Sequence, residues 1–213
     1  IDVVENWAPR EELPLQPRDN PWARQHGLHD KLVFLYSGTI GLKHDPGVLL
    51  AAAERFKDRP DNRVVVVSEG IGADWLRKEG GHLPNLVLLP FQPFEKLPEV
   101  VATGDVLMGV LEPDAGIYSV PSKVLTYLCA GRPLLVAMPP ENLASRILTR
   151  EKAGIVVPAG DRAAFVAAAE KLAADPNLRA ELGRNALAYA DRTFDIARVS
   201  QRIAAIAAEA LKG

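Results

Sequence analysis

The sequence contains very little cysteine, and its net charge is small. A single cysteine, Cys129, occurs in 213 residues, which excludes an internal disulfide. It lies between Leu128 and Ala130 in an apolar, helix-like stretch, so we expect a buried and unreactive thiol. The formal net charge of −2 argues against a surface for nucleic acid, which needs a clustered excess of Lys and Arg. A small anionic ligand is still compatible with this composition.

Long hydrophobic runs and targeting segments are also missing. No apolar run approaches the roughly 20 residues that cross a bilayer, so we expect no membrane span. The hydrophobic fraction of 48% is typical of a globular protein. Residues 1–10 contain acids, Trp7 and Pro9 in place of the basic start and apolar segment of a signal peptide. We therefore expect a cytoplasmic protein.

Clusters with metal-ligand spacing are likewise lacking. The four histidines, His26, His29, His44 and His82, are scattered along the sequence, and we expect them at the surface. The sequence therefore predicts no bound metal.

From residue 31 onward, short apolar runs alternate with longer helical patterns. Unbroken apolar runs are typical of strands covered on both faces, and their alternation with helices predicts a parallel sheet wrapped by helices. The expected fold class is α/β, a Rossmann-like doubly wound parallel sheet of about six strands. The expected strands are 32–36, 64–67, 86–89, 106–110, 134–136 and 155–157. The expected helices between them are 46–56, 74–78, 96–102, 122–130 and 142–152.

The last quarter of the chain predicts extra C-terminal helices with no strand between them. Asp161 is suited to cap the first of these helices, and Asp175-Pro176 ends it and begins the next. We expect these helices to pack against the domain. The apolar stripe of the final helix, after Phe194, contains Val199, Ile203, Ile206 and Ala210.

Residues 1–30 are rich in proline, which interrupts any periodic pattern. We expect a linker and lead-in over residues 1–30 and one domain over residues 31–213.

The loops after the strands are where a doubly wound sheet binds ligands. The first, 37–46, contains Gly38 and Lys43, and it is either a phosphate-facing loop or an ordinary turn into a helix. It lacks the glycine and hydroxyl residue that flank the lysine of a P-loop. The nearest dinucleotide fingerprint, 70–75, has Trp75 in place of its third glycine, which disfavours a Rossmann dehydrogenase.

The segment after the fourth strand is more informative. Ser119 or Ser122 can cap the following helix, and Gly131 fits its end. The helix dipole, its unpaired N–H groups, these hydroxyls and Lys123 would all attract a diphosphate. An exposed cation at a helix start costs about 0.3–1 kcal/mol, so stability does not require Lys123. From the residues alone, a binding role and a solvated surface role for Lys123 are equally open.

Several segments, in matching order and spacing, resemble the C-terminal domain of family 4 retaining glycosyltransferases, which have the two-Rossmann GT-B architecture. They are 36–43, 89–97, 120–133, 153–161 and 174–184. The pairing of 121–123 (Pro-Ser-Lys) with 130–133 (Ala-Gly-Arg-Pro) resembles the branch that builds cell-surface polysaccharides. The resemblance implies binding of a nucleoside diphosphate-sugar and sugar transfer with retention of configuration, without a metal or other cofactor.

The resemblance also implies roles for individual residues. Gly38 would let the backbone approach the diphosphate, and Lys43 and Lys123 would be the catalytic cations that stabilise it as it departs. Ser122 would hold the distal phosphates together with Lys123. The base would lie between Phe91 and Leu97.

The other candidates are less specific. Ser119 offers a hydroxyl near the same helix start, and Glu69 follows the second strand, where it either faces the ligand or serves a turn. Thr39, Tyr118 and Thr126 stand where the family often has one Arg and two Glu residues that contact the donor. These three departures leave a weakened or inactive donor site as an alternative.

Two other functions remain open from the sequence. A sugar-nucleotide epimerase of the GT-B type would use the same diphosphate site, and a non-catalytic module would bind a nucleotide-sugar or a partner protein. Asn6-Trp7 resembles the point where the family's chain enters its second domain. We therefore expect a fragment that is inactive alone and needs its own N-terminal domain, which would hold the acceptor site and any peripheral membrane contact.

Overall fold

Six parallel strands form one sheet, with the spatial order β3-β2-β1-β4-β5-β6. The computed structural model describes residues 4, 6, 8–41, 44–113 and 122–211. The strands are β1 (Leu32–Ser37), β2 (Asn62–Val67), β3 (Leu86–Leu89), β4 (Val106–Val110), β5 (Leu134–Ala137) and β6 (Gly154–Val157). The predicted doubly wound α/β sheet is confirmed.

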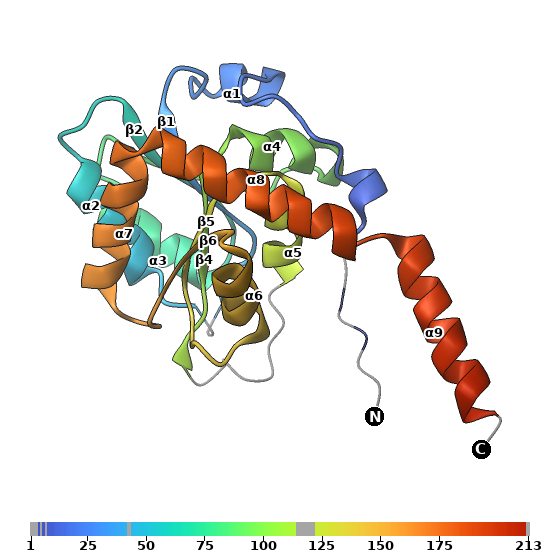
Figure 1. The fold of residues 1–213 in the computed structure, drawn as a ribbon. Coiled ribbons are helices and arrows are strands. Elements are labelled where there is room, and N and C mark those ends of the chain that lie inside the picture. Colours follow the sequence, from blue (N-terminus) through green and yellow to red (C-terminus); the bar gives the residue numbers. More distant parts are fainter. Residues whose placement is uncertain (1–3, 5, 7, 42–43, 114–121, 212–213) are drawn as a thin grey trace.

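Helices cover both faces of the sheet (Figure 1). One face packs against α2 (Gly47–Phe56), α3 (Ile71–Gly80) and α7 (Arg162–Ala174). The other packs against α1 (Pro21–Gln25), α4 (Leu97–Thr103), α5 (Ser122–Cys129) and α6 (Leu143–Glu151). The long helix α8 (Pro176–Thr193) contributes Leu182 to the first core and Ala186 to the second. It therefore joins the two layers.

Strand β1 shows why the apolar runs are unbroken. Its side chains alternate between the two cores, with Val33 and Leu35 on one side and Phe34 and Tyr36 on the other. All four are fully buried. A strand covered by helices on both faces cannot place a polar side chain at alternate positions without burying it.

The order of the strands places a topological switch point between β1 and β4. The chain first builds outward through β2 and β3, and α4 then returns it to the other side of β1. Strand β1 therefore pairs with β2 on one side and with β4 on the other. In open sheets of this kind, ligands bind in the crevice outside the carboxyl ends of the strands at the switch point.

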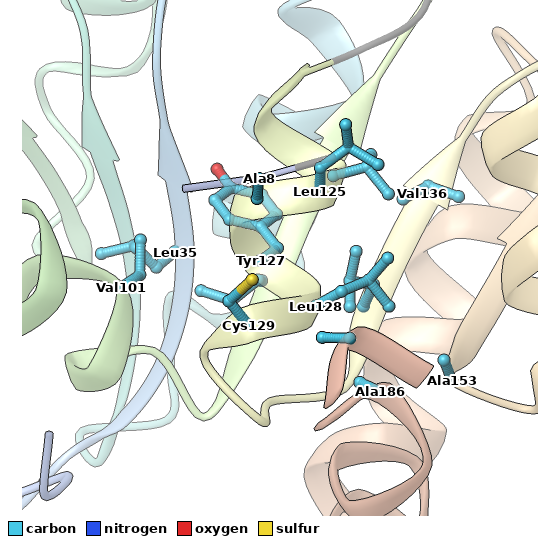
Figure 2. Packing of buried hydrophobic residues seen from close by; sticks show 14 of the residues in the cluster. Ala8, Leu35, Val101, Leu125, Tyr127, Leu128, Cys129, Val136, Ala153 and Ala186 are labelled. Carbon is cyan, nitrogen blue, oxygen red and sulfur yellow. The ribbon is translucent and has the colours of Figure 1, made fainter. Parts of the chain in front are cut away.

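Helix α5 packs its apolar side against the sheet (Figure 2). Leu125, Tyr127, Leu128 and Cys129 are buried there, together with Val136 of β5. Cys129 is a free thiol, and burial raises its pKa to about 11. The prediction of a buried thiol is confirmed, and this pKa keeps the thiol protonated and unreactive at neutral pH.

The proline-rich lead-in differs from its expected role as a linker alone. Its side chains Ala8, Leu13, Trp22 and Leu28 belong to the same core as α4 and α5. Asn20 caps α1 through a 2.9 Å hydrogen bond from the Ala23 amide. The core therefore extends to residues before 31, because prolines that break a periodic pattern still leave apolar side chains able to pack.

The helix boundaries agree with most of the sequence signals. Asp161 and Asp175 accept hydrogen bonds from the amides of Ala164 and Leu178, so the predicted caps of α7 and α8 are confirmed. Helix α3 begins at Ile71, three residues before its expected start. The fingerprint-like glycines near this start made the segment resemble a loop, although Gly72 lies inside the helix.

The final helix, α9 (Ile196–Ala210), forms as predicted but does not pack as predicted. Val199 is its one buried residue, and Ile203 is 47% exposed. Figure 1 shows α9 projecting away from the rest of the chain. The expectation that its apolar stripe packs against this domain is wrong, because the pattern predicts an apolar face and not the surface that covers it. Among the described residues, no helix has both the length and the apolar character to span a membrane.

The contact between α8 and the end of α5 yields a stability prediction. A Cβ at Gly183 would lie 2.5 Å from the carbonyl oxygen of Gly131. Gly183→Ala should therefore lower the free energy of unfolding by about 1–3 kcal/mol, because two backbones must separate. An alanine usually stabilises a helix interior by roughly 0.5–1 kcal/mol instead.

Urea unfolding would measure this change, with the exposed neighbour Arg184→Ala as the control expected within about 0.5 kcal/mol of the unmodified protein. An unchanged or higher stability of Gly183→Ala would contradict the close approach.

Candidate functional site

Two adjoining cavities open at the carboxyl end of β1. The larger, of about 410 Å³, is walled by the loop after β1 and the starts of α4 and α5. The smaller, of about 200 Å³, lies between β1 and the β3–α4 loop. Ser37, Gly38 and Leu97 line both cavities, which therefore form one crevice. The larger cavity brings together the candidates Gly38, Thr39, Leu97, Ser122, Lys123 and Thr126.

The start of α5 presents a polar face to this crevice. Most of its buried positions face the core, whereas Ser122, Lys123 and Thr126 line the larger cavity together with the buried Tyr127. The first amide groups of a helix have no carbonyl partner within it, and the helix dipole places partial positive charge there. The predicted end of this helix is confirmed, because Gly131 follows it with a φ of +63°.

Lys123 lies against the end of β1. Its ammonium group donates a hydrogen bond to the hydroxyl of Tyr36 and is 3.8 Å from the centre of the Tyr36 ring. It also lies beside Gly38, where a Cβ would be 3.2 Å from Lys123 Nζ. Gly38 has a φ of +129°, so both the backbone and the neighbouring lysine favour glycine at this position.

Burial changes the charge of Lys123. It lowers the pKa of the ammonium group from 10.5 to about 7. A cation–π contact compensates only part of the lost hydration of the ammonium group. A bound anion would raise this pKa again, because an opposite charge nearby favours the protonated form. The site can therefore couple anion binding to uptake of a proton at neutral pH.

Two tyrosines that sequence reasoning missed hold this part of the crevice. Burial raises the pKa of Tyr36, so its hydroxyl stays protonated and donates to the carbonyl oxygen of Thr39 at 2.9 Å. The hydroxyl of Tyr127 donates to Ser37 O at 3.0 Å and accepts from Ser37 N at 2.8 Å. The available signal was a tyrosine inside an apolar run, because a buried hydroxyl needs a partner.

The smaller cavity is aromatic. Phe91 and Phe94, which are 45% and 54% exposed, line it from the β3–α4 loop. Leu97 closes the opposite side of this loop at the start of α4. Such a wall suits a flat, apolar ring system.

Glu69 has a different placement from the other candidates. It lies outside the described walls of both cavities, and its carboxylate accepts a 3.2 Å hydrogen bond from the amide of Phe91. The structure therefore places it as a support of the aromatic loop. The candidates Lys43, Tyr118 and Ser119 lie outside the described residues.

No group of three or more His, Cys, Asp or Glu side chains among the described residues could hold a metal ion. That no metal takes part stays a prediction. Of the histidines, His29 and His82 are exposed, whereas His26 and His44 are half-buried.

The strand order and the crevice at the switch point define the class of this domain. It is a doubly wound, Rossmann-like α/β domain, a class that binds nucleotides at this edge of the sheet. A family model of group 1 glycosyl transferases matches residues 31–175, and the chain belongs to this family. The family expected from the sequence is confirmed.

Individual relatives agree with this assignment. The putative colanic acid biosynthesis glycosyl transferase WcaI of Escherichia coli strain K12 is 32% identical over 104 residues, 48% of this chain and 25% of WcaI. HepE from Anabaena, solved with UDP and glucose, has a TM-score of 0.81 at 15% identity over 98% of this chain and 57% of HepE. The C-terminal domain of the group 1 protein LpcC from Francisella tularensis has a TM-score of 0.68 at 14% identity, over 89% of this chain and 99% of that one.

These comparisons confirm the predicted fold, that of a C-terminal domain of a GT-B protein. The chain spans a quarter of WcaI and little more than half of HepE.

The lowered pKa of Lys123 yields a prediction about stability and pH. Between about 7 and 10.5, the unfolded chain holds a proton that the folded chain has released, so the free energy of unfolding rises with pH over this range. Lys123→Met removes the buried charge. It should therefore raise the melting temperature most below pH 7, and the gain should shrink as the pH approaches 10.5.

Thermal unfolding at about pH 6 and about pH 9.5 would test this dependence, with Lys78→Met as the control. Lys78 is exposed on α3, so its replacement should leave the melting temperature nearly unchanged at both pH values. A Lys123→Met protein that melts below the unmodified protein at about pH 6 would contradict the prediction.

Proposed function

We propose that this chain is the nucleotide-sugar-binding half of a retaining glycosyltransferase that acts in the biosynthesis of cell-surface polysaccharide or glycoconjugate. The observation that carries the proposal is the position of Lys123, at the start of α5 and beside Gly38 in the switch-point crevice. Family membership and the solved complex of HepE with UDP and glucose support it. The colanic acid role in the name of WcaI supports the product class.

The two cavities suit the two parts of a nucleoside diphosphate-sugar. The diphosphate would lie in the larger cavity, against the backbone of Gly38, the first amides of α5 and the side chains of Ser122 and Lys123. The base would enter the smaller cavity beside Phe91 and Leu97. The shared wall at Gly38 and Leu97 would let one ligand occupy both.

The proposed mechanism is electrostatic. Negative charge builds on the diphosphate as the bond to the sugar breaks, and Lys123, Lys43 and the start of α5 would stabilise it. Loss of one such donor commonly reduces a rate by about 100-fold or more. Because the pKa of Lys123 is about 7 without ligand, the arriving diphosphate would draw a proton onto this lysine.

Two short hydroxyl side chains, Thr39 and Thr126, line the larger cavity where the family resemblance implies longer charged ones. The ribose and the donor sugar would then depend on other contacts. Two alternatives therefore remain to be tested. One is a catalytically degenerate module, and the other is an epimerase that uses the same site.

We also propose that the chain acts together with its own N-terminal domain, in the cytoplasm or at the inner face of the membrane. WcaI and HepE are longer than this chain, and the apolar stripe of α9 is uncovered. Residues 8–12 and the connection between α8 and α9 line a cavity of about 580 Å³. The acceptor site and any peripheral membrane contact would belong to that other domain.

Alanine at Lys123 is the central test of the proposed site. It should weaken UDP binding by roughly 10- to 100-fold, because a charge-assisted hydrogen bond contributes about 1.5–3 kcal/mol. In the unmodified protein, UDP affinity should fall as the pH rises above 7, by up to about tenfold per pH unit. In Lys123→Ala, affinity should vary little over the same range.

Isothermal titration calorimetry would measure these affinities, and Lys78→Ala is the matched control for loss of one positive charge. Equal losses in the two variants would remove Lys123 from the site. A panel of UDP-, GDP- and TDP-sugars separates the alternatives, since failure to bind any of them would favour a protein-interaction module. Epimerisation of the sugar without transfer, in the full-length protein, would favour the epimerase.

The apolar stripe of α9 gives a second test. Ile203→Glu should leave the melting temperature of this chain unchanged, because the side chain is already 47% exposed. In the full-length protein it should reduce transferase activity, because the stripe would pack against the N-terminal domain.

Gln201→Glu is the control for that test, since it adds the same charge at an exposed position outside the stripe. Equal activity of the two full-length variants would contradict packing of the stripe against the N-terminal domain.

A further inference from the structure

The lead-in helix α1 reaches the aromatic loop that walls the smaller cavity. The indole Nε1 of Trp22 donates a 3.0 Å hydrogen bond to Gln92 Oε1. The amide group of the same glutamine donates through Nε2 to the carbonyl oxygen of Pro90 at 2.9 Å. Gln92 therefore bridges a residue before β1 to the backbone of the loop after β3.

The end of this bridge at Trp22 is buried and hydrogen-bonded to α4. Trp22 is 2% exposed, and its backbone amide donates to Glu99 Oε2 of α4 at 3.0 Å. Asn20 donates to Glu99 O at 3.0 Å and to Thr103 Oγ1 at 3.1 Å. Helix α1 is thus fixed along α4, and the indole nitrogen has a defined position from which to hold Gln92.

The loop after β3, at the Gln92 end of the bridge, is held by one other side chain among the described residues. Glu69, after β2, accepts the amide hydrogen of Phe91. The loop is therefore fastened on both sides of its aromatic residues, while Phe91 and Phe94 stay exposed at the cavity. Without the bridge, the segment between Pro90 and Pro93 would lose the link that joins it to α1.

We propose that Trp22 is a positioning residue for recognition of the nucleobase and that it acts on Gln92, which itself lines the smaller cavity. The inference rests on the proposed function, because it takes the smaller cavity as the site of a planar base attached to a diphosphate. Trp22 acts through Gln92, which holds the loop so that Phe91 and Phe94 present their rings to the base. The bridge lies on the base side of the crevice, whereas Lys123 lies in the larger cavity. It therefore affects the nucleoside part of the ligand and not the diphosphate part.

Two substitutions break the bridge from opposite ends. Trp22→Phe keeps an aromatic ring in the core and removes the N–H donor, and Gln92→Met keeps the length of the side chain and removes the acceptor. Each should weaken UDP binding by about fivefold, the usual contribution of one hydrogen bond. Gln92→Met also removes the bond to Pro90 O, so the double variant should lose no more than Gln92→Met alone, which already lacks the bond to Trp22.

Calorimetry would measure UDP binding, and an NMR titration suited to weak binding would measure inorganic pyrophosphate. We expect the pyrophosphate affinity to stay unchanged in both variants. Trp75→Phe on α3 is the matched control, since Trp75 is 38% exposed and lies outside the described walls of both cavities. It should bind UDP as the unmodified protein does.

Three results would overturn the inference. The first is an unchanged UDP affinity in Gln92→Met, a substitution that does not alter the core. The second is an equal loss of UDP affinity and pyrophosphate affinity. The third is a double variant whose loss of UDP affinity equals the sum of the losses in the single variants. If the unmodified protein binds neither ligand, the proposed function itself fails, which is a different outcome from loss of the bridge alone.

Discussion

The burial of one ammonium group at the end of a strand is the constraint on which the site depends. Lys123 adds a positive charge where the start of α5 is already electropositive, and folding removes much of the water around it. The Tyr36 ring and hydroxyl compensate part of that cost, and an anion would compensate more. The arrangement costs stability, a cost common at binding sites, and it fits the proposed role of the crevice in holding a diphosphate.

Most of the fold could be predicted because its signal is local. Each strand is an unbroken apolar run, since both faces of the sheet are covered, and aspartates cap the helices that they precede. The errors arose where a local pattern has two meanings. The glycines at 70 and 72 match a phosphate-binding loop as well as a helix start, and the stripe on α9 defines an apolar face without defining its partner.

The site was predictable only in part. The rule that ligands bind after the carboxyl ends of strands led to Gly38 and Lys123, which the structure places together. It could not find Tyr36 or Tyr127, because their hydroxyls act through partners that only the tertiary structure brings close. The bond between Trp22 and Gln92 spans 70 residues of sequence, and no spacing rule connects a proline-rich lead-in to a loop after β3.

Helix α8 lies outside the region that the family model matches but inside the packed domain. The family model matches residues 31–175, which end before α8 begins, yet α8 supplies apolar side chains to both cores. The lead-in supplies others, from Ala8 to Leu28. A polypeptide trimmed to the family's shared region would expose apolar surface on both layers of the sheet. The region that the family model matches is therefore shorter than the region whose side chains fill the two cores.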